Sequence, residues 1–507
     1  MPRFLFVVAV VLAILPPVID RGLSADAPAT IVPHPPLDRR NHHYPSHRDP
    51  LLPSPLVKLP VGAVRPGGWL RKQLELQAAG FHGHLTEISA FLRKDKNAWL
   101  SPDGQGERGW EEVPYWLKGF GDCAYLLGNQ EQIKEAKVWI EGAIASQRAD
   151  GFFGPRGKGA QATVESTKGK YDLWPNMVML QCLRSYYEVT GDRRVLDLMT
   201  KYFRWELSVP DADFLPPYWQ QQRAADNLDS VLWLYDRTGD GWLLDLATKT
   251  HRHTADWTDG VPNWHNVNMT EAFGGPAFYY PLSKDRRHLD AAERNWHTIR
   301  EKYGQVPGGL FGGDENCRPG YADPRQAIET CGMVEFMYSC ERLLSVAGDP
   351  RWADRCEDVA FNSLPAALTA DFTALRYLTA PNLIQSDKGN KAPGFDNGGA
   401  MLEMNPYHHR CCQHNFGHGW PYLAEHLWMA TGDDGLAAVV YSECEVKAKV
   451  GDGTEVTLTE HTHYPFDEHV EIKVTALKPT RFPFYLRVPG WCDNPTVRVN
   501  GEQGWSP

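Results

Sequence analysis

The sequence lacks two features that would mark a nucleic-acid-binding or membrane-spanning protein: an excess of positive charge and long apolar runs. Its 507 residues include 52 Lys and Arg against 63 Asp and Glu, a formal net charge of −11. Such an acidic chain is a poor partner for nucleic acid or an anionic membrane surface. After Leu15 no segment approaches the roughly 18 uncharged apolar residues of a membrane-spanning helix. The length and the hydrophobic share of 42% instead predict a large buried core in more than one domain.

The longest apolar run is short and lies at the start of the chain. Phe4 to Leu15 follows a single basic residue, Arg3, and precedes two prolines and a group of small residues up to Ala27. A run of this length is too short to span a bilayer and is typical of the apolar region of a signal peptide. We therefore expect residues 1–27 to be a signal peptide and the protein to be exported, either secreted or periplasmic. An N-terminal anchor is the alternative interpretation.

The ten cysteines are too unevenly spaced for the disulfide framework of a small exported protein. Those inside apolar helical patterns, where a free thiol behaves as a small hydrophobic group, are Cys123, Cys182, Cys340 and Cys356. Cys331, Cys411 and Cys412 lie in a different context and need a separate explanation.

A regular repeat is also missing. Residues 28–60 are rich in Pro, His and Arg and are predicted to form an extended lead-in. Over residues 61–436 apolar residues recur at helical spacing, and the helical patterns end at a Gly followed by Asp or Asn. These stops are Gly128, Gly191, Gly239, Gly348 and Gly432. Their irregular intervals argue against a solenoid and favour a barrel of paired helices with long loops at one end.

From residue 437 the pattern changes to that of half-buried strands. Apolar and polar residues alternate around Val456, from Val470 to Val474 and from Phe484 to Val488. We therefore predict a mainly α-helical protein, with a helical barrel over 61–436 followed by a β-sandwich over 437–507. Because this β-module is thin, we expect either a fragment of a longer protein or a sheet that packs against the helices.

Two short motifs concentrate metal-binding side chains. Glu329-Thr-Cys331 opens a helical pattern, and Cys411-Cys412 follows a group of histidines. Together they supply three thiols and one carboxyl group, a donor set that zinc accepts readily. Adjacent cysteines rarely bond to each other without strain, whereas a metal would keep both as thiolates. From spacing alone, disulfides to distant cysteines, zinc binding through the nearby histidines and plain packing all stay open.

Glu329-Thr-Cys331 followed by Cys411-Cys412-x-x-Asn415 resembles the signature of glycoside hydrolase family 127, whose known members include β-L-arabinofuranosidases. The segments that extend this similarity along the chain are Pro60–Trp69, Glu112–Lys118, Leu486–Trp491 and Val499–Glu502. The resemblance implies an (α/α)6 barrel followed by β-sandwiches, in agreement with the periodicity of the sequence. It is also compatible with a homodimer formed through the β-domains.

The resemblance further implies a zinc-dependent retaining mechanism. The zinc ligands that it implies are Glu329, Cys331, Cys411 and Cys412. The resemblance implies that the nucleophile is the first cysteine of the pair, Cys411, which zinc would hold as a thiolate by lowering its pKa. Glu315 would be the general acid/base that protonates the leaving oxygen and then activates water. Asp314 is the alternative position for this carboxyl group.

The substrate pocket departs from the family pattern. His409 and Gln413 stand where characterised members carry Cys and Pro, and Trp174 and Gly275 lie roughly where arabinofuranosidases carry substrate-contacting histidines. The residues that we expect to contact the substrate are His265, Tyr377 and Asn415. A purely structural role is the alternative for His265 and for Tyr377. The changes affect the sugar pocket but leave the zinc and nucleophile positions intact.

The sequence therefore predicts an exported retaining exo-glycosidase, similar to β-L-arabinofuranosidases, that acts on plant or microbial glycans. One rival is another carbohydrate-active enzyme on the same barrel, such as a lyase, which would have an Arg-rich cleft and no need for Cys411. The other is a non-catalytic, zinc-stabilised scaffold that binds glycans. That scaffold would have a closed four-ligand metal shell and no acid beside it.

Overall fold

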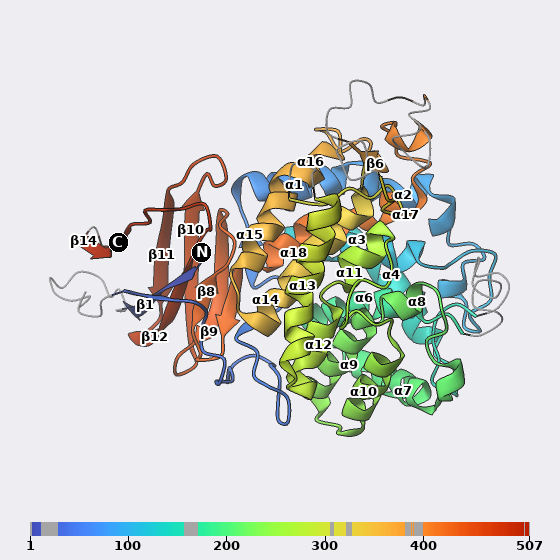
Figure 1. The fold of residues 1–507 in the computed structure, drawn as a ribbon, viewed down its shortest axis with the longest axis horizontal. Helices are drawn as coiled ribbons and strands as arrows, with labels where there is room; N and C mark the ends of the chain where they lie inside the picture. The colour runs from blue at the N-terminus through green and yellow to red at the C-terminus, as the bar shows by residue number, and fades with distance from the viewer. Residues whose placement is uncertain are drawn as a thin grey trace. The chain divides into compact units, whose positions relative to one another are not determined.

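The computed structural model describes residues 3–11, 29–156, 171–304, 309–320, 327–380, 387, 389, 399–500 and 502–505. The chain divides into two compact units, one mainly helical and one mainly β (Figure 1). The helical unit comprises Gln73–Ser339 and Asp358–Tyr422. The β unit comprises Met1–Lys72, Cys340–Glu357 and Leu423–Pro507.

The helical unit is a succession of helical hairpins. Its longer helices are α3 (Glu112–Leu127), α4 (Gln130–Ala145), α6 (Trp174–Thr190), α7 (Arg194–Ser208), α9 (Ala225–Thr238), α10 (Trp242–His253), α12 (Gly275–Ser283), α13 (Arg286–Tyr303) and α14 (Thr330–Ala347). Its shorter helices are α2 (Leu85–Ile88), α8 (Trp219–Gln222), α11 (Asn266–Ala272), α16 (Leu364–Ala366) and α17 (Arg410–Asn415). The helices α1 (Gly68–Ala79) and α18 (Gly419–Glu425), like α14, run across the division between the units, and α15 (Arg351–Asp358) lies almost wholly in the β unit.

Burial separates the helices into an inner and an outer ring. In α3 nearly every residue is buried, whereas α4 buries only one stripe, which includes Trp139 and Ile140. A helix that is apolar on one stripe faces the core on that side only, and one that is buried all round lies inside it. The inner helices α3, α6, α9 and α12 contact one another in sequence, and α4, α10 and α13 each pack on the inner helix before them. This arrangement is the predicted toroid of helical hairpins.

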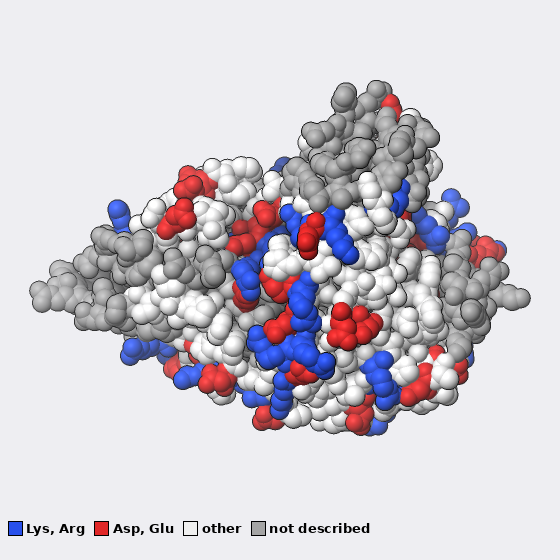
Figure 2. Space-filling model, viewed as in Figure 1, with Lys and Arg blue, Asp and Glu red and all other residues white. Residues whose placement is uncertain are grey.

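The outer helix α13 shows how the exposed side of the ring is built. Its buried residues Ala291, Ala292, Asn295 and Ile299 recur at helical spacing. The remaining face carries charged side chains, and Figure 2 shows Lys and Arg interspersed with Asp and Glu on this side of the molecule. Within the part of the chain that is described, no helix combines the length and apolarity needed to cross a membrane.

Most of the predicted helix stops are confirmed, and one is wrong. Gly128, Gly191 and Gly239 end α3, α6 and α9 with φ of 68°, 67° and 76°, the left-handed conformation that glycine adopts without strain. Gly432 instead follows a strand, β7 (Trp428–Thr431). All four residues of β7 are buried, so the segment has no alternation that would distinguish it from a buried helix.

The β unit contains two main sheets. The six-stranded sheet has the order β2 (Thr30–Val32), β1 (Arg3–Val11), β12 (Thr480–Val488), β8 (Leu436–Ala438), β7 and β3 (Leu56–Lys58), antiparallel except for the parallel pair β12–β8. The four-stranded antiparallel sheet has the order β11 (Val470–Ala476), β10 (Thr454–Thr462), β9 (Cys444–Val450) and β4 (Val64–Pro66). Two short two-stranded sheets are β13 (Val497–Val499) with β14 (Glu502–Trp505), and β5 (Ile328–Glu329) with β6 (Leu378–Thr379), the latter in the helical unit.

The alternation that predicted the β-module is present in these strands. In β10 buried residues such as Val456 and Leu458 alternate with more exposed ones along the whole strand. The predicted lead-in contributes the strands β2 and β3. The strands of the C-terminal part begin with β7 at Trp428, a few residues before the predicted start of the β-module at residue 437. The segment Arg3–Val11 pairs with β12 in the whole chain. This pairing does not test removal of residues 1–27, so the signal peptide stays a prediction.

The close approach between α3 and the segment Phe416–His418 leads to a stability prediction. A Cβ added to Gly119 would lie 2.2 Å from the backbone carbon of Gly417, whereas one added to Gly121 would meet only side-chain atoms at 3.7 Å or more. We expect Gly119→Ala to lower the free energy of unfolding by about 1–3 kcal/mol or more, because backbone has to move. Gly121→Ala, in the same helix, should be neutral or stabilising by about 0.5–1 kcal/mol.

Urea denaturation of both variants beside wild type checks this prediction. Equal midpoints for Gly119→Ala and Gly121→Ala would mean that the backbones of α3 and Gly417 are further apart than described.

Candidate active site and metal centre

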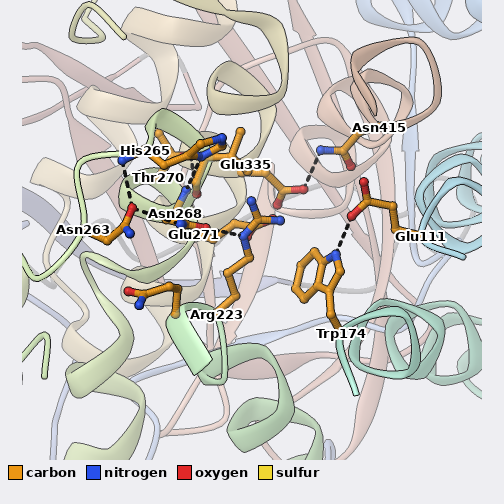
Figure 3. A network of polar contacts seen from close by, with 12 residues as sticks. Glu111, Trp174, Arg223, Asn263, His265, Asn268, Thr270, Glu271, Glu335 and Asn415 are labelled. Atoms are coloured by element: carbon orange, nitrogen blue, oxygen red, sulfur yellow. Dashed lines mark hydrogen bonds and ion pairs between the residues drawn. The ribbon is translucent and has the colours of Figure 1, made fainter. Parts of the chain in front are cut away.

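The site residues lie at the starts of the inner helices and of the short helices beside them. These helices begin at the same end of the toroid. The free amide groups at the start of a helix carry partial positive charge. The residues at or next to these starts are Glu111 (α3), Trp174 (α6), Arg223 (α9), His265 (α11), Cys331 (α14) and Cys411 (α17). Part of this arrangement is shown in Figure 3, where Trp174 donates a hydrogen bond to Glu111 and the Arg223 side chain lies between this pair and His265 in the view.

Glu329, Cys331, Cys411 and Cys412 form a compact donor cluster. One ligand atom from each lies within 4.8 Å of all the others. The sulfur atoms of Cys411 and Cys412 lie 3.8 Å and 3.9 Å from Oε1 of Glu329. All ten cysteines of the sequence are described and all are free thiols, so the alternative that Cys411 and Cys412 form disulfides with distant cysteines is wrong.

The chemistry of this cluster fits a bound metal ion. Oε2 of Glu329 is buried without a hydrogen-bond partner, as expected for a group whose partner is a ligand. Burial raises the pKa of Glu329 well above its usual range, and the charges of Glu315 and Cys411 raise it further. Burial likewise raises the pKa of the Cys412 thiol. A divalent cation would relieve this cost, since it favours the ionised form of every donor around it.

Cys411 differs from the other two thiols of the cluster. It is partly exposed, whereas Cys331 and Cys412 are buried. Hydrogen bonds from the thiols of Cys331 and Cys412 are the main cause that holds the pKa of Cys411 well below its usual range. Cys411 is therefore the thiol of the cluster that is both accessible and most readily ionised.

Glu315 is linked to Cys411 through one hydroxyl group. The Tyr377 hydroxyl donates a hydrogen bond to Oε1 of Glu315 and accepts one from the Cys411 thiol, with 3.0 Å between Sγ and Oη. Nε2 of His265 lies 2.8 Å from the other carboxylate oxygen, Oε2 of Glu315. The backbone of Glu315 has φ of 103°, a strained value for a residue with a side chain. Two contacts to the carboxyl group, from Tyr377 and His265, and a strained backbone thus hold Glu315 beside the cluster.

The structure brings most of the predicted site residues together. The residues that meet are Glu315, Glu329, Cys331, Cys411, Cys412, His265 and Tyr377. Asp314, the alternative acid, is fully buried and forms an ion pair with Arg318 at 3.1 Å. Asn415 lies deeper, where its amide donates a hydrogen bond to Glu335 at 2.8 Å.

A second acidic group was missed by the sequence interpretation. Nε1 of Trp174 donates a hydrogen bond to Oε2 of Glu111 at 2.6 Å. Burial, with the charge of Glu112 as the second cause, raises the pKa of Glu111 to about 8. Trp174, noted as a departure from the family pattern, therefore holds a carboxyl group near Cys411. The signal in the sequence was the pair Glu111-Glu112 at a helix start.

Arg223 and a row of aromatic rings were missed as well. The Arg223 guanidinium lies 4.6 Å from the ring centre of Trp174 and 4.7 Å from that of Trp219, and it pairs with Glu271 at 2.7 Å. The ring of Trp219 lies 4.8 Å from that of His265 and stacks at 4.6 Å on Tyr218. This row extends the site from Glu315 with flat apolar surfaces of the kind that pack against sugar rings.

Comparison with known families and structures identifies the protein class. The model of the β-L-arabinofuranosidase GH127 catalytic domain matches residues 64–425, and that of the GH127 middle domain matches residues 435–506. Together with the toroid and its acidic site, these matches define the protein as a glycoside hydrolase. The chain belongs to glycoside hydrolase family 127.

Solved structures with the same fold include two family members. One is a GH127 β-L-arabinofuranosidase from Geobacillus stearothermophilus T6, with 18% identity, a TM-score of 0.69, and coverage of 87% of this chain and 77% of that one. Another is a GH127 β-arabinofuranosidase with 18% identity, a TM-score of 0.66, and coverage of 89% and 76%. A search of curated protein sequences gave no match.

The exposure of Cys411 leads to a prediction about thiol reactivity. Cys411 and Cys492 are partly exposed, and the other eight cysteines are buried. We expect iodoacetamide to modify these two residues first in native, chelator-treated protein. Added Zn²⁺ should protect Cys411, since a bound thiolate is less available, but not Cys492, which serves as the internal control. Peptide mass spectrometry measures both rates.

Modification of Cys331 or Cys412 ahead of Cys411 would show that the accessible thiol of the cluster has been misassigned. Equal protection of Cys411 and Cys492 by Zn²⁺ would point to a non-specific effect of the metal.

Proposed function

We propose that this protein is an exported, retaining exo-glycosidase that hydrolyses β-L-arabinofuranosides, with Cys411 as nucleophile and Glu315 as general acid/base. The observation that supports it most is the Tyr377 hydroxyl, which contacts both the Cys411 thiol and the Glu315 carboxyl group. A retaining glycosidase needs a nucleophile and an acid/base close together at one anomeric carbon. The proposed export rests on the apolar run Phe4–Leu15.

Zinc is the metal that we propose for the donor cluster. Three thiolates and one carboxylate make a four-donor set typical of zinc, and thiolates favour zinc over calcium or magnesium. Glu329, Cys331, Cys411 and Cys412 would hold it. When bound, zinc would keep Cys411 deprotonated at neutral pH and make its sulfur a better leaving group later in the reaction.

The first half of the reaction breaks the glycosidic bond. Sγ of Cys411 attacks the anomeric carbon while Glu315 donates its proton to the departing glycosidic oxygen. The alcohol leaves, and the sugar is held on Cys411 as a thioglycoside. His265, at 2.8 Å from Glu315, orients the carboxyl group, and Tyr377 holds it next to the sulfur.

The second half releases the sugar. Glu315, now a carboxylate, removes a proton from a water molecule, which attacks the anomeric carbon as the C–S bond breaks. The electron pair of that bond returns to Cys411, and Glu315 regains its proton. Two inversions at one carbon retain the anomeric configuration.

The choice of sugar follows the description of the family, whose catalytic-domain model carries the name β-L-arabinofuranosidase. The site departs from the family pattern at Trp174, which donates a hydrogen bond to the buried Glu111 carboxyl group. An exo-acting enzyme on plant or microbial glycans would bind a terminal sugar at Cys411 and Glu315, with the rings of Trp219 and Tyr218 beside the remainder of the glycan.

We expect Cys411→Ser and Glu315→Gln to fail at different steps. On p-nitrophenyl β-L-arabinofuranoside, Cys411→Ser should lose activity by about a thousandfold or more, because the first step has no nucleophile. Glu315→Gln should lower turnover by about 10²–10⁴-fold. It should still release a burst of one equivalent of nitrophenol, because this leaving group needs little protonation but the water attack needs a base. Stopped-flow absorbance measures the burst.

The controls separate the assignments. Cys492→Ser, in the β unit, should keep full activity. Asp314→Asn should turn over without a burst. A burst in Asp314→Asn and none in Glu315→Gln would assign the acid/base role to Asp314. Full activity of Cys411→Ser would contradict the thiolate mechanism and favour a lyase or a two-carboxylate enzyme. Zinc binding without turnover of any glycoside would favour the non-catalytic scaffold.

A further inference from the structure

A buried polar group lies one helical turn below the donor cluster and takes no part in the proposed chemistry. Nζ of Lys118 on α3 lies 2.7 Å from Oε1 of Glu335 on α14, and the two side chains are 1% and 2% exposed. The same oxygen of Glu335 accepts a hydrogen bond from Nδ2 of Asn415 on α17 at 2.8 Å. Figure 3 shows Glu335 and Asn415 pointing toward each other.

The positions of these residues relate them to the metal donors. Cys331 and Glu335 lie one turn apart on α14, and Cys411 and Asn415 lie one turn apart on α17. Residues separated by one turn share a face of a helix. The first turn of each helix therefore carries donor thiols, and the second turn carries the hydrogen bond between the two helices. Lys118 joins the third helix, α3, to the same point.

The charge of Glu335 strengthens this contact. Burial alone would raise its pKa, but Lys118 and, next, His418 outweigh burial and lower the pKa of Glu335 to about 2. Glu335 is thus an anion at all ordinary pH values, and its bond to Asn415 is charge-assisted, roughly twice as strong as a neutral one. The ring of His418 completes the surroundings, with Nε2 at 3.7 Å from Oε2 of Glu335.

We propose that Lys118, Glu335 and Asn415 form a clamp that sets the spacing between Cys331 on one helix and Cys411-Cys412 on the other. In this role Asn415 is a positioning residue and does not contact the sugar. The inference rests on the proposed zinc site. The α17 helix spans only Arg410–Asn415, and at its first turn the Cys331 amide of α14 donates a hydrogen bond to Sγ of Cys412 at 3.4 Å. The Glu335–Asn415 bond is a second link between the two helices, one turn further on. A lost Glu335–Asn415 bond would let the two pairs of donors separate.

The test compares the zinc affinity of Asn415→Ala with that of Asn295→Ala. Asn295 is a matched control, because it is a buried amide in the same unit whose side chain donates to the backbone oxygens of Trp257 and Phe273. Both substitutions remove a buried amide and lower stability by similar amounts. Competition for Zn²⁺ with a chromophoric chelator measures affinity in the full chain.

We expect Asn415→Ala to bind Zn²⁺ about 10–100-fold more weakly than wild type, and Asn295→Ala to bind it as wild type does. The thiolate-to-metal absorption of the Co²⁺-loaded protein should shift in Asn415→Ala alone, because donor spacing changes. Excess Zn²⁺ should restore much of the lost glycosidase activity. Asn415→Ser, which keeps a polar group too short to reach Glu335, gives the same readouts if the Ala variant does not fold.

The outcomes separate the clamp from the proposed function. Wild-type affinity and an unchanged Co²⁺ spectrum in a folded Asn415 variant would overturn the clamp and leave the zinc site standing. An equal loss of Zn²⁺ affinity in Asn295→Ala would show that general destabilisation causes the effect, and this result would also overturn the clamp. Failure of the wild-type protein to bind Zn²⁺ or Co²⁺ would overturn the metal assignment, and the clamp with it.

Discussion

The burial of thiols and carboxyl groups together at one end of the helical unit is the constraint on which the rest of the site depends. Glu329 sits among three sulfur atoms with its pKa raised well above normal. Deeper in the ring, Glu271 and Glu335 are buried as well and are paired with Arg223 and Lys118, each at 2.7 Å. An isolated buried charge is far more costly than a paired one. The buried carboxylates and thiolates therefore require a cationic side chain, a helix start or a metal ion beside them.

The cations that meet this requirement also order the rest of the site. The Arg223 guanidinium that pairs with Glu271 lies over the rings of Trp174 and Trp219. Such contacts are worth about 2 kcal/mol when desolvated and restrict both partners. Trp219 in turn packs against His265, which contacts Glu315. One buried ion pair is thus connected, through two rings, to the carboxyl group that we propose as acid/base.

How much could be predicted depends on how locally each feature is encoded. The thiols and Glu329 lie in two short motifs, so their common role could be predicted before their distances were known. Lys118 and Glu335 are 217 residues apart, and nothing near either one indicates the other. Glu111 and Trp174 are 63 residues apart, and their contact was missed for the same reason. The error at Gly432 has a different cause, since a short, wholly buried strand has no period to detect.

By itself the sequence determined the helical hairpins, the alternating strands and the residue types at the helix starts, because periodicity, glycine caps and short motifs act over a few residues. Only the tertiary structure decided which of these starts meet. In it the Tyr377 hydroxyl lies between Glu315 and Cys411. Asp314 forms an ion pair with Arg318, and Asn415 donates a hydrogen bond to Glu335. The physical reason is that a side chain reaches only a few ångströms, so its partners are set by how the inner helices pack around the ring.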